Sequence, residues 1–68
     1  MDVDLLKKKI RVEGFTMRSF ALRCGITEAG LHARLRRKSG FKASDIFQIR
    51  DILNLSVEEV SLIFFDGK

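Results

Sequence analysis

Hydrophobic residues recur along the chain at spacings of three and four, and no segment alternates convincingly with a period of two. Such spacing places apolar side chains on one face of an amphipathic helix. Residues typical of caps and turns divide this pattern into five short segments. The sequence therefore predicts one all-α domain of five short helices over residues 1–68.

The first predicted helix begins near Asp2 or Asp4, because acidic residues favour the positive end of a helix. Gly14 is suited to its C-terminal end, and Phe15 leads to Thr16, the expected N-cap of a second helix over residues 17–24. The apolar face of the first helix is Leu5, Leu6 and Ile10, and the buried stripe of the second is Met17, Phe20, Ala21 and Cys24.

A third helix is expected from Glu28 to about Arg37, with Thr27 as its N-cap. Leu31 and Leu35, four residues apart, form its buried face, and the loop Ser39-Gly40 follows. For the fourth helix we expect Ser44 as the cap and Asn54 as the end, with apolar positions at Ile46, Phe47, Ile49, Ile52 and Leu53.

Ser56 and Glu59 have the spacing of a capping box, which predicts a fifth helix ending near Phe65. An inward stripe of Val57, Val60 and Phe64 leaves three apolar side chains without a place in the core: Leu62, Ile63 and Phe65. Apolar surplus of this kind favours a homodimer interface. The alternative is that the phenylalanines fold back over the first helix.

Composition excludes several classes of function. One cysteine rules out an intramolecular disulfide, and clusters of Cys or His that would bind a metal are absent. Nothing assembles an acid, a base and a nucleophile, so we expect no enzyme activity, cofactor, metal or small-molecule substrate. No apolar run approaches the ~18 residues of a membrane span and no signal peptide is recognisable, so a cytoplasmic protein is expected.

The charge of the chain is concentrated in one segment. The net charge is +4, yet residues 29–44 hold five bases and no acid, whereas the rest carries eight bases and nine acids. A nearly neutral body with one cationic face is typical of proteins that bind a polyanion. The alternative is a face that only improves solubility.

Residues 16–37 have the spacing of a helix-turn-helix. Ala21 is small where two helices cross, Gly25 permits a left-handed turn, and Ile26 can anchor the turn in the core. Thr27 caps the next helix, and Leu31 fixes it from beneath. Together the five positions predict that the third helix is presented to the major groove of DNA.

The segment "TMRSFALRCGITEAGLHARLRRKSGF" resembles the helix-turn-helix of the lambda-repressor/Cro-like (XRE-type) family, in particular its small phage repressor-like proteins. Those proteins tend to have "L-N-G-K-S-x-F" after the recognition helix and "L-N-L-S/T-x-E-E-I…I-F-F" at the end. The counterparts here are "LRRKSGF" at 35–41 and "LNLSVEEVSLIFF" at 53–65. The resemblance implies a compact five-helix bundle that binds operator DNA as a homodimer in a bacterial host.

Three positions depart from the family pattern. Met17 stands where a glutamine often reaches a phosphate, and Gly30 lies inside the recognition helix. Arg36-Arg37 replaces the Asn-Gly that normally ends this helix, so the helix can extend further.

Helical geometry and the resemblance together give the candidate DNA contacts. Those expected to meet base edges are Glu28, Ala29, His32, Ala33 and Arg36. Those expected to meet phosphates are Arg18, Arg23, Thr27, Arg34, Arg37, Lys38 and Lys42. Two alternatives stay open: His32 as an idle surface residue, and Glu28 as a favourable charge at the helix start.

Two classes of function follow. The first is a sequence-specific DNA-binding transcriptional regulator, a repressor that occupies double-stranded operator DNA. The second is a protein-interaction module on the same scaffold, which the small side chains at 29, 30 and 33 and the apolar tail favour. The cationic face distinguishes them, because a module that binds only protein does not need it.

Overall fold

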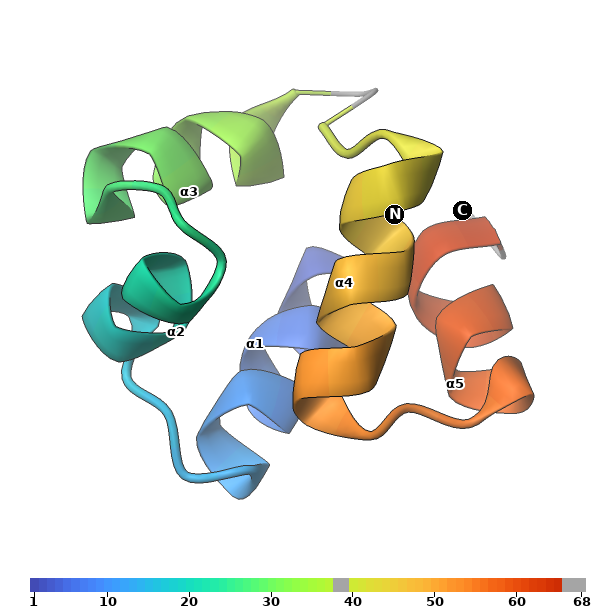
Figure 1. Ribbon diagram of the computed structural model, residues 1–68. Helices are drawn as coiled ribbons and strands as arrows, with labels where there is room; N and C mark the ends of the chain where they lie inside the picture. The colour runs from blue at the N-terminus through green and yellow to red at the C-terminus, as the bar shows by residue number, and fades with distance from the viewer. Residues whose placement is uncertain (38–39, 66–68) are drawn as a thin grey trace.

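All regular structure in the computed structural model, which describes residues 1–37 and 40–65, is helical (Figure 1). This confirms the predicted all-α domain. The last helix continues directly into a wider, π-helical turn, η1. The elements are α1 (Val3–Val12), α2 (Met17–Arg23), α3 (Glu28–Arg36), α4 (Ala43–Leu53), α5 (Val57–Val60) and η1 (Ser61–Phe65).

Side-chain caps begin the first and last helices as predicted. The Asp2 carboxylate accepts the Leu5 N–H at 3.0 Å, so Asp2 is the N-cap of α1. At α5, the Ser56 hydroxyl accepts the Glu59 N–H at 3.0 Å, and the Glu59 carboxylate accepts the Ser56 N–H at 2.9 Å. Each bond satisfies an amide that the helix itself leaves without a partner.

The N-terminal cap of α4 differs from the prediction. Lys42 is the N-cap residue, and Ser44 lies inside the first turn, so the assignment of Ser44 as the cap was wrong. Asp45 replaces its function: the Asp45 carboxylate accepts the backbone N–H of Lys42 at 3.1 Å. The helix therefore begins with a side chain three residues inside it.

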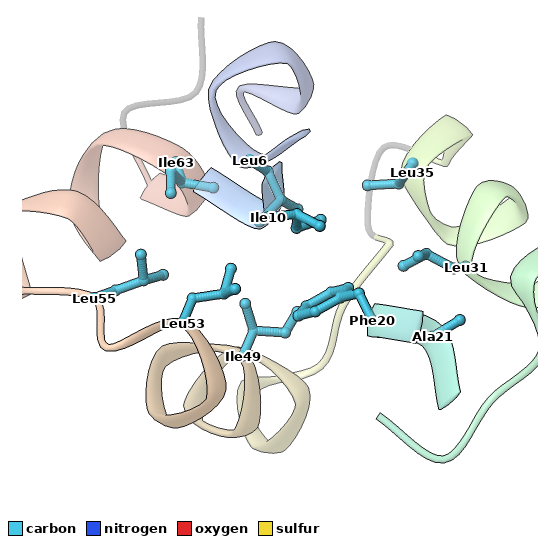
Figure 2. Close-up of a cluster of buried hydrophobic side chains, with 10 residues drawn as sticks. All are labelled: Leu6, Ile10, Phe20, Ala21, Leu31, Leu35, Ile49, Leu53, Leu55 and Ile63. Atoms are coloured by element: carbon cyan, nitrogen blue, oxygen red, sulfur yellow. The ribbon is translucent and has the colours of Figure 1, made fainter. Parts of the chain in front are cut away.

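One hydrophobic core joins all the elements (Figure 2). In this view the ring of Phe20 lies between Ile49 of α4 and Leu31 of α3. Phe20 is fully buried and meets the ring of Phe15 edge to face, with 5.7 Å between centroids. The core consists of Leu6, Ile10, Phe20, Ala21, Leu31, Leu35, Ile49, Leu53, Leu55 and Ile63.

The two ends of the chain meet in the fold. The backbone N–H of Asp2 donates to the carbonyl of Ile63 at 2.7 Å, which ties the start of α1 to η1. In Figure 1, α2 and α3 stand at the left of the molecule and α5 with η1 at the right, with α1 and α4 between them. The helix-turn-helix is thus separated from the C-terminal turn.

Three apolar positions were placed on the wrong side of their helices. Phe47 is 56% exposed and Val57 is 84% exposed, whereas Ile63 is fully buried. Leu55 explains Val57: it follows the left-handed Asn54, its N–H bonds the carbonyl of Arg50, and it fills the core just before α5 begins. Hydrophobic contact after such a turn is common. The inward face of the last helix is therefore shifted toward Ile63.

The ion pair between α1 and α5 makes stability depend on pH. Lys9 Nζ lies 2.8 Å from Glu59 Oε2, a hydrogen bond that lowers the pKa of Glu59 and raises the pKa of Lys9. A lowered carboxyl pKa stabilises the fold above its unfolded value, and this is lost as pH falls through the folded pKa. The raised pKa of Lys9 stabilises below its unfolded value and is lost as pH rises through the folded one.

We therefore expect the coupling between Lys9 and Glu59 to be present near neutral pH and to vanish in acid and in strong base. A double-mutant cycle of Lys9→Met and Glu59→Gln, measured by urea unfolding at three pH values, reports it directly. The cycle of Arg50 and Asp51, adjacent and exposed at the surface, serves as the control for general charge effects. A Lys9–Glu59 coupling that is equal at pH 3 and pH 7 would contradict the assignment.

Candidate nucleic-acid interface

The segment from Thr16 to Thr27 fixes α2 and α3 relative to each other. At the start of α2, Thr16 and Ser19 cap each other: the Ser19 N–H donates to Thr16 Oγ1 at 3.0 Å and the Thr16 N–H to Ser19 Oγ at 2.9 Å. At the start of α3, Thr27 Oγ1 accepts the N–H of Gly30 at 3.0 Å. Both predicted threonine caps are confirmed.

The turn between the two helices has the geometry that the sequence predicted. Gly25 has φ +79°, a left-handed conformation that other residues rarely adopt. The N–H of Gly25 bonds the carbonyl of Leu22, and the N–H of Ile26 bonds the carbonyl of Ala21, each at 3.0 Å. These two bonds close α2 and direct Ile26 against the core.

Leu31 and Leu35 hold α3 against the core, both buried as predicted. The opposite side of α3 is open to solvent: Glu28, Ala29 and Arg36 are exposed, and His32, Ala33 and Arg34 are half-buried. The predicted outer face is thus outside in the fold. Met17, the departure at the start of α2, packs against the core.

Two residues expected to act independently on this face form a pair. His32 Nε2 lies 3.3 Å from Glu28 Oε2, one helical turn away. Because α3 is an uninterrupted helix, residues four apart lie one above the other and can meet in this way. Glu28 is therefore not only a charge at the helix start, and His32 is not an idle surface residue.

Arg34 has an acidic neighbour that the local sequence did not suggest. Its Nη1 lies 3.3 Å from Asp45 Oδ2, the oxygen that also accepts the N–H of Lys42. Asp45 lies just beyond the acid-free segment 29–44, and folding brings it back beside α3. One of the five cations of that segment is thereby neutralised, whereas sequence reasoning treated all five as unneutralised.

The remaining cations around α3 are available to a ligand. Within residues 1–37 and 40–65, no ion pair involves the side chains of Arg18, Arg23, Arg36, Arg37 and Lys42, all of which are exposed. Lys38, a further candidate, lies outside the described residues. These residues come from α2, from α3 and from the start of α4.

Helix α3 ends at Arg36, and Arg37 is extended, with φ −88° and ψ 144°. The expectation that the helix runs to Arg37 or further was therefore wrong. Gly40 explains the end: it is buried, and a Cβ on it would overlap the carbonyl oxygen of Arg34. The chain returns so closely over the last turn that only glycine fits.

We expect Gly40→Ala to destabilise the domain by about 1–3 kcal/mol, the usual cost of forcing atoms into a packed region. Gly30→Ala is the matched control, because its Cβ meets only Thr27 Oγ1 at 3.2 Å and Ile26 Cβ at 4.0 Å. That strain is offset by the ~1 kcal/mol that alanine contributes in a helix interior. Urea unfolding of both variants measures the difference; equal stabilities would show that the backbone at Gly40 moves away freely.

The candidate dimer residues separate into two groups. Ile63 is buried within its own chain, so its proposed place in a dimer interface was wrong. Leu62 and Phe65 remain outside, 48% and 68% exposed. Leu22 of α2, which we did not single out, is also 68% exposed. The signal was available, because Leu22 lies off the stripe formed by the buried residues of its helix.

Other kinds of site were sought across residues 1–37 and 40–65. No group of His, Cys, Asp or Glu there could hold a metal ion, and no pocket is present. No helix in these ranges is long and apolar enough to cross a membrane. Cys24 is half-buried, and its burial raises the pKa of its thiol.

Comparison of the chain with protein-family models, with curated proteins and with solved structures found no match.

Proposed function

We propose that this protein is a DNA-binding transcriptional regulator of the lambda-repressor/Cro-like kind, which acts as a repressor by occupying an operator through α3. One observation carries the proposal: the exposed cations without acidic partners surround an exposed helix whose start and preceding turn are fixed by hydrogen bonds. DNA presents phosphates on both sides of a groove that admits one helix. A fixed helix with cations beside it suits that target.

Phosphate contacts supply most of the affinity in this proposal. Arg18 and Arg23 of α2 and Arg37 and Lys42 beyond α3 contact the backbone, and the outer face of α3 contacts base edges. Ala29 and Ala33 offer only methyl groups, so direct readout is sparse and DNA shape contributes to specificity. Arg34 contributes less than its position suggests, because Asp45 already neutralises it.

The test is fluorescence anisotropy with labelled duplex from upstream of the protein's own gene, against a scrambled duplex, over a salt series. Binding that favours the upstream duplex, and weakens with log salt by about 0.9 per phosphate contacted, supports a regulator. Absence of binding to either duplex at low salt would rule out the DNA function. Equal binding to both would reduce the proposal to a non-specific DNA binder.

We further propose a homodimer that places two α3 helices about 34 Å apart on one DNA face. Leu62 and Phe65 support this, because both are exposed on the turn that lies away from α3 in Figure 1. We expect Leu62→Asp with Phe65→Ser to convert the dimer to monomer in sedimentation experiments. The control is Val57→Ser, which also removes an exposed apolar side chain but at the first turn of α5. A wild-type protein that sediments as a monomer, with and without operator, would contradict the dimer.

The second candidate function is a protein-interaction module. Specific observations favour it: Leu22 and Phe47 are large, apolar and exposed on α2 and α4, outside the proposed dimer turn. Capture of a specific protein partner by a chain that fails to bind DNA at low salt would make this the better account.

A further inference from the structure

The first two turns of α3 present few hydrogen-bonding groups to a ligand. Ala29 and Ala33 have none in their side chains, and Leu31 is buried. The groups left on the outer face are the carboxylate of Glu28 and the imidazole of His32. Any base edge read by hydrogen bonds from this part of the helix must therefore be read by these two side chains.

The geometry assigns different tasks to the two residues. His32 directs Nε2, the nitrogen farther from its backbone, at Glu28 Oε2, 3.3 Å away. The nitrogen that remains, Nδ1, lies nearer the helix and reaches less far outward. Glu28 keeps its other oxygen and further lone pairs for a donor. Both side chains stay partly exposed, so this donor can approach from outside.

We infer that Glu28 and His32 form one recognition unit for cytosine, in which Glu28 contacts the base and His32 is a positioning residue. The inference rests on the proposed function, and it names the base that this part of α3 reads. An ionised carboxylate only accepts hydrogen bonds. In the major groove the base donors are the N4 amino group of cytosine and the N6 amino group of adenine.

Cytosine is the better partner of the two. Adenine places its N7 acceptor beside N6, and two acceptors facing each other repel, which is why the amides of Asn and Gln are suited to adenine. The N4 group of cytosine has no such neighbour on its own base. A carboxylate held at this place therefore selects a C·G pair with the cytosine facing Glu28.

His32 makes this selection possible by holding the carboxylate. A glutamate side chain has several rotatable bonds, and ordering it on binding costs conformational entropy. It is also repelled by the phosphates on either side of the groove. A donor from His32 fixes the side chain before binding and offsets part of that repulsion.

The experiment selects bound duplexes from a randomised pool with the wild-type protein, Glu28→Gln, His32→Ala and His32→Gln. In the wild type we expect one position of each half-site to be cytosine, preferred by about tenfold, the range of a good base contact. Glu28→Gln should change that preference to adenine. His32→Ala should reduce it severalfold at the same position and at no other, and His32→Gln, whose amide can donate to Glu28, should restore it.

Arg36→Ala is the control, because it removes another side chain of the same outer face without touching the pair. Cytosine preference at one position that survives Glu28→Gln, or that is unaffected by His32→Ala, would overturn the recognition unit while leaving the regulator intact. A wild-type protein that binds no duplex would overturn both the proposed function and this inference. A purely structural role for His32 would lower affinity for all sequences equally and would also overturn it.

Discussion

Replacing Phe20 with alanine is expected to unfold most of the protein at 25 °C. Phe20 is fully buried, lies at the centre of the core in Figure 2, and packs edge to face against Phe15. Phe→Ala in a core costs about 3–5 kcal/mol, and a domain of this size has only ~3–5 kcal/mol of stability from its core. Loss of the far-UV helical signal and of the cooperative urea transition measures this.

Phe47→Ala is the matched control for Phe20→Ala, because it makes the same chemical change at a site that is 56% exposed. The guanidinium of Arg50 lies 5.2 Å from the centroid of the Phe47 ring, and losing that contact should cost only ~0.5–1 kcal/mol. If both variants lost equal stability, the core described here would be misplaced.

The double substitution Arg36→Ala with Arg37→Ala should have the largest effect on DNA binding. Both side chains are exposed at the end of α3, and neither forms an ion pair with the described part of the chain. At 0.1 M salt each lost phosphate contact is expected to weaken binding by roughly tenfold, and to make the salt dependence shallower by about 0.9. Anisotropy titrations over a salt series measure both quantities.

Lys8→Ala with Arg11→Ala removes the same charge from α1, which lies apart from α3 in Figure 1. Both of these side chains are exposed as well. We expect this control to change affinity only slightly and to leave the salt dependence almost unaltered. Equal effects of the two double variants would mean that net charge matters and position does not.

Local chemistry made much of the fold predictable. Thr16, Thr27 and Ser56 each bond an amide three residues ahead, and Gly25 adopts the left-handed turn, so these ends depend on neighbouring residues alone. The buried faces of α2 and α3 also follow from helical spacing. Such features are visible in a sequence because cause and effect lie within one turn.

The errors came from contacts between distant segments. Ile63 was expected outside, but η1 packs against α1, so the last turn presents a different face to the core. Arg34 appeared free because Asp45, eleven residues away, meets it only after the chain reverses at Gly40. In the candidate site, helical spacing predicted which side of α3 faces outward, but not that Glu28 and His32 would meet each other.

The hydrogen bond from Asp2 to Ile63 has a consequence for how the chain folds. It joins residues separated by almost the whole sequence, and closing so long a loop has a larger entropic cost than closing any of the turns between successive helices. The helix-turn-helix forms from local contacts, whereas the docking of η1 on α1 is a late and non-local step. The first region to open under stress is therefore this junction of the two ends, and α2 and α3 keep their mutual geometry longest.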